Sequence, residues 1–418
     1  MKSKYIVIIL LLIMVVSSFF TSCGKDRWEE YYPVTRHSLW MDSIMRVNYL
    51  WNDELEDEDD ITSTYFLNSV AFLAKMKYTD DKVSYVDTAC SVPITDYGYE
   101  LATSQVNDTA YMALITYIEP TTVSATAGLQ RGEWIMKVDG EFITSAKLSL
   151  LSDGDAHELM IGHYTTISLN EGSSDEEEEQ GVVIYDRMVN LPAASGYFPN
   201  DLPVVTIVND HVGYMLYTDI AEDNQLLVAT ASQTLSAGGI TDMVLDLRYA
   251  ATGDVSGFQY LASVLAPSSS LGNQLATVQY AESRHHDSSL PFLTASELEN
   301  GVNLNLSTLY VLTSSATSGP AEMLINCLQT VMKVVVIGQK TKGIGVACET
   351  FRDPISDQLL RLAACHITDA NGNADYVDTG ITPDYVVNQF SPIEGILPFG
   401  NPQENLLAKA LEIITNNL

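Results

Sequence analysis

The sequence predicts a multi-domain α/β protein with a helical N-terminal domain, a β domain and a C-terminal α/β domain of stacked strand–strand–helix units. Three observations support this order. Residues 40–76 carry apolar side chains at helical spacing. Residues 98–194 contain an alternating, strand-like run that closes with an Asp-Gly turn. Residues 211–416 alternate between buried-strand runs and amphipathic helical segments, as α/β folds do.

The first 22 residues are predicted to be a signal peptide and not part of the fold. Lys2 and Lys4 precede an apolar run at residues 5–20, which is short for a membrane span and typical of a signal-peptide core. Small residues stand directly before Cys23, so we expect a lipoprotein cleavage site with Cys23 as the lipidated first residue. An ordinary signal peptide or a short anchor is the alternative. The acidic residues that follow are consistent with an outer-membrane lipoprotein facing the periplasm or the cell surface.

These patterns divide the chain into five segments. They are a signal peptide (1–22), a linker (23–36), a helical domain (37–90), a β domain (91–195) and an α/β domain (203–418). In the helical domain, two apolar stripes separated by an acidic segment are expected to form the core. The stripes are Trp40, Ile44, Val47 and Trp51, and then Tyr65, Phe66, Val70 and Leu73.

The composition argues against several kinds of partner. A formal net charge of −33 disfavours binding to nucleic acid or to anionic lipid. The cysteines other than Cys23 form no CxxC or His–Cys cluster, so we expect no metal site and no other cofactor. They are predicted to be buried free thiols, although Cys348 and Cys365 could instead face each other on neighbouring strands. These cysteines are Cys90, Cys327, Cys348 and Cys365.

One stretch, residues 312–347, organises the rest of the chain. A strand that leads into a helix through a tight turn places a nucleophile beside backbone N–H groups, which can receive an oxyanion. The elements predicted here are the end of a buried strand (310–312), a polar turn (313–320), a helix with one apolar face (321–332), a second buried strand (334–337) and a further turn (338–345).

At these residues the sequence resembles a known family, the carboxyl-terminal processing (tail-specific) serine peptidases in their bacteroidete lipoprotein form. In that family a serine before the helix is the nucleophile, and a lysine after the second strand is its general base. The matching residues are Leu312, Thr313, Ser315, Thr317 and Glu322 in the first motif, and Gly338, Thr341 and Gly343 in the second.

The resemblance places Gly319 at the serine position and Ile344 at the lysine position, with the family's spacing between them unchanged. Glycine offers no nucleophile and isoleucine offers no base. Losing either catalytic partner typically lowers the rate by about 10⁴ or more. The retained matches, including Glu322, would then form a scaffold that is kept for packing.

A third part of the family's catalytic apparatus is also altered. The family continues Asp-Leu-Arg-x-Asn-x-Gly-Gly, and a glycine N–H there helps to form the oxyanion hole. This chain retains the Asp-Leu-Arg part as residues 246–248, has Ala250 for the asparagine and Thr252 for the first glycine, and retains Gly253. The retained aspartate and arginine are expected to hold the turn through a salt bridge.

Further segments extend the resemblance over nearly the whole mature chain. Residues 98–194 resemble a PDZ domain, and residues 97–101 stand where such domains capture a terminal carboxylate. Gly98 and Tyr99 are therefore the predicted peptide-binding residues, with a purely structural β domain as the alternative. Residues 380–387 match a Gly-Ile-x-Pro-Asp segment of the same enzymes. The resemblance implies a ClpP/crotonase-like fold for the C-terminal domain.

Three hypotheses about function follow. The first is a non-catalytic relative that binds peptides or protein C-terminal tails and reaches the outer membrane through lipidated Cys23. The second is an active serine peptidase that uses displaced groups, Ser318 beside Gly319 and Lys342 two residues before Ile344. The third is a structural or assembly lipoprotein whose partners bind elsewhere.

Overall fold

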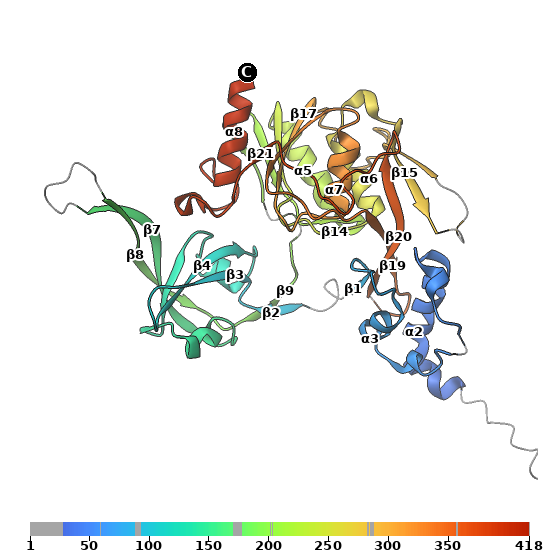
Figure 1. The fold of residues 1–418 in the computed structure, drawn as a ribbon, viewed down its shortest axis with the longest axis horizontal. Helices are drawn as coiled ribbons and strands as arrows, with labels where there is room; N and C mark the ends of the chain where they lie inside the picture. The colour runs from blue at the N-terminus through green and yellow to red at the C-terminus, as the bar shows by residue number, and fades with distance from the viewer. Residues whose placement is uncertain are drawn as a thin grey trace, which may run out of the picture.

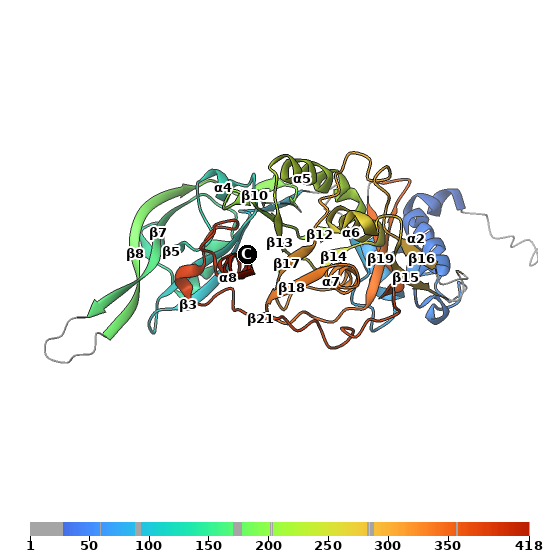
Figure 2. The same cartoon turned by 90° about the horizontal axis from the view of Figure 1, so that it is seen from above.

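The structure, a computed structural model, describes residues 28–417 except 59, 88–92, 170–177, 201, 203, 282–283, 285–287 and 357. The predicted signal peptide, Cys23 and Cys90 lie outside the described residues. Figures 1 and 2 place the β part at one end of the molecule and the N-terminal helices at the other, with the α/β part between them. No helix within the described ranges is both long and apolar enough to cross a bilayer.

The N-terminal helices pack against the α/β part and share its core. Helix α2 (Trp28–Asn48) and helix α3 (Ser69–Met76) lead to strand β1 (Tyr85–Asp87), which pairs antiparallel with β20 (Leu359–Asp369). Their buried side chains meet apolar residues of β20 in one cluster. That cluster contains Met41, Met45, Tyr49, Ile61, Phe72, Leu73, Met76, Leu360, Leu362 and Ala363.

One prediction about this region is wrong and another is confirmed in part. The predicted linker at residues 23–36 is helical from Trp28 onward, although Pro33 lies inside α2. The predicted apolar stripes are confirmed in part. Leu73 is buried and Trp40, Ile44, Trp51 and Tyr65 pack against this cluster, whereas Val47, Phe66 and Val70 are exposed.

The β part is an antiparallel sheet with the order β3-β4-β5-β7-β8, in which β6 pairs with β5. The predicted Asp139-Gly140 turn is present, with φ of 51° and 77° at its two residues, as a tight hairpin requires. A two-stranded ribbon of β2 (Ile94–Asp96) and β9 (Ser195–Tyr197) lies where the chain enters and leaves this part. The sheet strands are β3 (Tyr99–Gln105), β4 (Tyr111–Ile118), β5 (Trp134–Val138), β6 (Glu141–Phe142), β7 (His157–Leu169) and β8 (Glu178–Leu191).

The α/β part is built on a six-stranded sheet with the order β10-β11-β13-β17-β18-β21, parallel except for the β10–β11 pair. One face packs against α5, α6 and α7, and the other packs against α8. The elements are β10 (Val204–Val208), β11 (Val212–Leu216), β13 (Asp242–Asp246), β17 (Thr308–Thr313), β18 (Lys333–Gly338), β21 (Tyr385–Val386), α5 (Gln225–Ala237), α6 (Val255–Leu265), α7 (Pro320–Leu328) and α8 (Asn405–Asn417).

A second sheet has the order β1-β20-β15-β16, with β19 (Val346–Arg352) also paired to β20. Strands β15 (Gln274–Tyr280) and β16 (Ser288–Pro291) complete it. Cys348 and Cys365 lie on β19 and β20 but are not opposite each other, since Cys348 pairs with Ala363. Together with Cys327 they are buried free thiols, as predicted.

A buried ionic network joins the end of β13 to α8 and to the β part. Arg248 pairs with Asp246 (Nη2 to Oδ2, 2.7 Å) and with Glu404 (Nη1 to Oε1, 2.7 Å), and all three are buried. Glu404 also contacts Arg131 of the β part at 3.5 Å. Removing one partner of a buried ion pair typically costs about 3–5 kcal/mol. The predicted structural role of Asp246 and Arg248 is confirmed.

We predict that Glu404→Gln reduces the acid dependence of stability. Burial alone would raise the pKa of Glu404, but the charges of Arg248 and Arg131 outweigh burial and hold this pKa below its ordinary value. Such a carboxylate stabilises the fold above the unfolded-state pKa of about 4.3, and the contribution is lost as pH falls through the lower folded-state pKa. Urea unfolding between about pH 7 and pH 3 should show a smaller loss of unfolding free energy in this variant.

The matched control is Glu412→Gln, which changes an exposed carboxylate on α8, the helix that Glu404 directly precedes. It should keep the acid dependence of the wild-type protein. An equal or steeper loss of stability in Glu404→Gln would contradict the role given to the network.

Candidate catalytic cleft

The turn after β17 places Gly319 at the N-cap of α7. Gly319 has φ 56° and ψ −119°, a conformation that other residues adopt only under strain. Pro320 follows at the first helical position, where a missing N–H costs nothing. The nucleophile turns of α/β-hydrolases have the same sharp strand-to-helix form. The backbone geometry that presents a nucleophile is present here without the side chain.

The buried carboxylate of Glu322 ties this helix start to the loop after β18. Its Oε2 accepts the backbone N–H groups of Gly319 (3.0 Å) and Ile344 (2.8 Å). Its Oε1 accepts the N–H of Gly343 (2.6 Å) and the hydroxyl of Thr341. The positions that the resemblance assigns to the nucleophile and the base are therefore joined through one oxygen atom. Both are held by backbone groups, which every residue type supplies except proline.

The turn that contains Gly253 is fixed by its packing. Strand β14 (Thr252–Gly253) pairs in parallel with β12 (Asp219–Ile220). Gly253 has φ 144°, and a Cβ at this position would collide with the backbone of Ile220. Asp254 then caps α6 by accepting the N–H of Gly257 at 2.8 Å. Packing alone is therefore sufficient to require glycine at position 253.

A cleft of about 220 Å³ lies among these turns. Ile344 and Val346 give it apolar walls, and Cys348 lies beside them. Burial raises the pKa of the Cys348 thiol above its ordinary value, so it does not supply a thiolate nucleophile at neutral pH. The lining residues are Lys82, Val83, Tyr85, Ala251, Thr252, Gly253, Ser318, Gly319, Pro320, Lys342, Ile344, Val346 and Cys348.

Ser318 and Lys342 both line the cleft but do not contact each other through a hydrogen bond. The Ser318 hydroxyl is buried and donates to the carbonyl oxygen of Ala251 at 3.4 Å. The side chain of Lys342 is exposed, and its backbone N–H donates to the carbonyl of Thr317 at 3.0 Å. A serine nucleophile needs its base within hydrogen-bond reach, with some loosening in an unliganded state.

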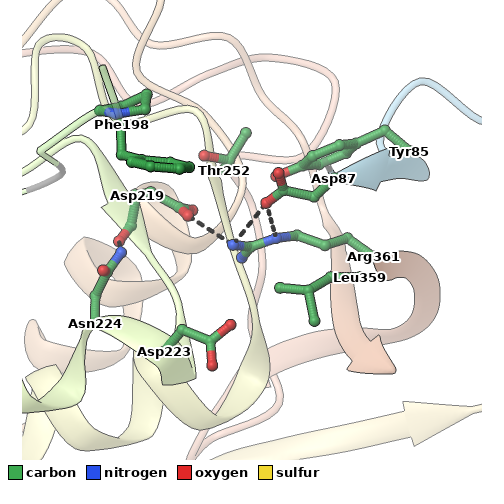
Figure 3. A pocket seen from close by; sticks show the side chains of 10 residues that line it. Tyr85, Asp87, Phe198, Asp219, Asp223, Asn224, Thr252, Leu359 and Arg361 are labelled. Atoms are coloured by element: carbon green, nitrogen blue, oxygen red, sulfur yellow. Dashed lines mark hydrogen bonds and ion pairs between the residues drawn. The ribbon is translucent and has the colours of Figure 1, made fainter. Parts of the chain in front are cut away.

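A larger pocket of about 460 Å³ adjoins the cleft, because Tyr85 and Thr252 line both. Figure 3 shows Arg361 in this pocket between two carboxylates. Its Nη2 pairs with Asp219 (2.9 Å) and with Asp87 (3.2 Å). The two cavities lie next to each other between the start of α7 and β20, and we call them together the groove.

Sequence reasoning did not find this second pocket. Its lining comes from segments that are far apart in the chain, including Asp87, Asp219 and Phe198. The available signal was Arg361, a charged residue inside the apolar run 359–365. A charged side chain in such a run is seldom buried unless it is paired with an opposite charge. Arg361 therefore indicated buried carboxylate partners, which the sequence alone did not identify.

The two predicted peptide-binding residues have internal contacts. The N–H of Gly98 donates to Asp96 (2.6 Å), and its carbonyl accepts the N–H of Glu119 (2.8 Å). The hydroxyl of Tyr99 donates to the carbonyl of Leu151 at 2.8 Å. In this conformation the Gly98 N–H is not free to bind a ligand carboxylate. Peptide binding at Gly98 and Tyr99 stays a prediction.

Among the described residues, no group of three or more His, Cys, Asp or Glu side chains is arranged to hold a metal ion. The protein groups that form the cleft are Glu322 with its hydrogen-bond donors, the turn that contains Gly253, and the apolar wall around Ile344.

Comparisons with known proteins identify the family. A profile described as "Peptidase family S41" matches residues 211–387, and a second, "Peptidase S41 N-terminal domain", matches residues 37–85. The structure is similar to the crystal structure of a Bacteroides fragilis NCTC 9343 protein classed as an S41 protease. The two are 35% identical, with 91% of this chain and 97% of that chain covered and a TM-score of 0.77. The chain belongs to peptidase family S41.

A curated S41 relative is more distant. The carboxyl-terminal-processing protease of Synechocystis sp. is 24% identical over 292 residues, which is 70% of this chain. The chain spans 62% of the length of that relative. These similarities confirm the predicted relationship to carboxyl-terminal processing proteases and the mixed α/β, multi-domain fold. In this S41 protein, Gly319, Ile344 and Gly253 lie together in one cleft.

We predict that Glu322→Ala strongly destabilises the protein. The change leaves two buried backbone N–H groups, one partly buried N–H group and the Thr341 hydroxyl without their acceptor. Each unsatisfied buried group typically costs about 1–3 kcal/mol, so the unfolding free energy should fall by roughly 3 kcal/mol or more. Urea unfolding measures the loss. The control Glu412→Ala removes an exposed carboxylate and should change stability by less than about 1 kcal/mol.

Proposed function

We propose that this S41 protein is a cell-envelope lipoprotein that binds peptides or protein tails in the retained groove and does not hydrolyse them. The observation that carries the proposal is the pair of residues at the start of α7 and in the loop after β18. Glu322 holds both places by hydrogen bonds, yet they carry glycine and isoleucine. The groove is therefore built as a peptidase cleft is built, without the two reacting side chains.

The chemistry of amide hydrolysis explains why this matters. A serine–lysine pair works because the amine takes the hydroxyl proton as the oxygen attacks the carbonyl carbon. Gly319 has no side-chain oxygen, and Ile344 presents only carbon atoms. The family's asparagine and first glycine in the oxyanion turn are also replaced, by Ala250 and Thr252. Loss of one catalytic group typically removes most of the rate enhancement, because the catalytic groups act as a unit.

The groove has the size and character of a peptide site. Its larger pocket lies within the range of roughly 300–1,000 Å³ that is common for ligand sites. Apolar and aromatic walls from Ile344, Val346 and Tyr85 stand beside polar groups such as Arg361. Such a mixture suits an extended chain with alternating side chains and backbone amides. In this proposal the PDZ-like β part adds a second place for a tail to bind.

The proposed location is the outer membrane, through a lipid on Cys23. The apolar run at residues 5–20 and the small residues before Cys23 support it. An exported protein of this charge would remain soluble beside the membrane, because like-charged copies repel each other.

An active peptidase that uses Ser318 and Lys342 is the second candidate. Both side chains line the cleft, which is the observation in its favour. A hydrogen bond between them would be needed for catalysis, and Ser318 instead donates to Ala251. Proteolysis that is lost in Ser318→Ala would support this candidate over the first. A structural or assembly role, with partners that bind outside the groove, is the third candidate.

The binding proposal predicts that Thr252→Trp weakens the binding of tail peptides by about tenfold or more. Thr252 lines both cavities, so an indole at this position fills the groove at its centre. Thr241→Trp is the control, because Thr241 precedes β13 at the end of the strand away from the groove and is exposed. Fluorescence anisotropy of labelled peptides measures both. Equal affinity in the two variants would locate binding elsewhere and favour the third candidate.

The proposal that the protein does not hydrolyse peptides makes a second prediction. The double variant Gly319→Ser/Ile344→Lys should react with a fluorophosphonate probe, whereas the wild-type protein should not. A Cβ on Gly319 would have room, since the nearest atom in the described part of the chain, apart from its two chain neighbours, is Ala251 O at 3.9 Å. The serine will cost about 1–3 kcal/mol of stability because of its positive φ. Gly319→Ala/Ile344→Lys is the matched control and should stay unlabelled. Labelling of wild type would contradict the proposal.

A further inference from the structure

The first turns of α2 project beyond the body of the molecule and leave an apolar surface uncovered. On this helix Thr35, Ser38, Met41 and Met45 form the buried face. Tyr31 and Val34 stand four residues before Thr35 and Ser38, so they continue the same face toward the N-terminus. Tyr31 is 36% exposed and Val34 is 57% exposed.

A neighbouring turn adds three more apolar residues to this surface. The rings of Tyr31 and Phe66 meet edge to face at 5.5 Å, and Ser38 donates to the carbonyl of Leu67. Val70 follows in the first turn of α3 and is 59% exposed. We call this surface the N-terminal apolar patch. It consists of Tyr31, Val34, Phe66, Leu67 and Val70, all exposed by more than a third.

We propose that the N-terminal apolar patch docks onto the lipid bilayer surface beside the anchor. This builds on the proposed lipid at Cys23. Only four residues separate Cys23 from Trp28, so the five Cα-to-Cα steps between them reach at most about 18 Å before α2 begins. Tyr31 is one further helical turn away, about 5 Å. A protein anchored at that distance must present this end to the membrane.

The chemistry of the patch selects the kind of lipid surface. Tyrosine and phenylalanine beside aliphatic side chains are typical of segments that sit at the level of lipid headgroups. Residues 24–36 carry three basic and three acidic side chains, so this end of the molecule has no net charge that would attract anionic lipid. The partner is therefore a zwitterionic bilayer bound through apolar contact.

A depth-sensitive fluorescence measurement tests the docking directly. The lipidated full chain carries a bimane fluorophore on Val70→Cys. It also carries Cys90→Ser, because the other native thiols, Cys327, Cys348 and Cys365, are buried and should not be labelled. It is reconstituted in phosphatidylcholine vesicles whose acyl chains are brominated. The Val70→Cys probe should be quenched at least about twofold. The control probe on Phe142→Cys, which is 56% exposed on the β part, should not be quenched. An unquenched Val70→Cys probe would overturn the proposal.

Partitioning of the chain without its lipid supplies a second measurement. Residues 24–418 should bind phosphatidylcholine vesicles, and Phe66→Ser/Val70→Ser should lower the partition coefficient by about tenfold, given the apolar area lost. Val386→Ser removes an 81% exposed side chain elsewhere and should leave partitioning unchanged. If the patch variant instead abolishes self-association without changing lipid binding, the patch is a protein interface and the proposal is wrong.

Mass spectrometry of the mature N-terminal peptide shows whether Cys23 is acylated. This measurement tests the proposed lipid anchor separately from the docking proposal. If Cys23 is acylated and the Val70→Cys probe is unquenched, only the docking proposal fails. If Cys23 carries no lipid but partitioning still depends on Phe66 and Val70, the anchor proposal fails and the docking surface stands.

Discussion

The carboxylate of Glu322 is the interaction on which the cleft depends. It is fully buried and accepts hydrogen bonds from the start of α7 and from the loop after β18. These two segments approach each other because they share this one acceptor. Three of its four donors are backbone N–H groups, so the side chains at Gly319 and Ile344 can change without breaking the contact. The architecture of the cleft is thus independent of the groups that would react in it.

Other parts of the site have the same independence. Gly253 is required by its close approach to Ile220, whether or not its N–H ever meets an oxyanion. Arg248 and Asp246 are tied to α8 through Glu404, which fixes the turn after β13. The fold around the cleft therefore does not depend on which side chains stand at positions 319 and 344. Under the proposed function, binding and hydrolysis are separable, because the groove rests on backbone contacts whereas hydrolysis would need two reacting side chains.

The elements around the cleft were predictable because their signals are local. Buried apolar runs marked β17 and β18, and a helical face marked α7, although α7 ends at Leu328, four residues before the predicted end. The start of α2 was missed because Pro33 lies inside the helix, where a proline usually indicates a break. The family resemblance placed Gly319, Ile344 and Gly253, and the structure brings them into one cleft.

Long-range pairing set the limit of sequence reasoning. Arg361 gains its partners from β1 and β12, and no local pattern connects these strands. The burial of Glu322 was equally hidden, since a glutamate in the first helical turn is usually solvated and favoured there by the helix dipole. Its role as a shared acceptor follows only when the loop after β18 folds back on α7.

The central claim is that the groove binds a peptide and leaves it whole. The most direct test is the mass of a tail peptide recovered from its complex with saturating wild-type protein after prolonged incubation. The account predicts one species with the mass of the uncut peptide. Two fragments whose formation disappears in Ser318→Ala or Lys342→Ala would contradict it.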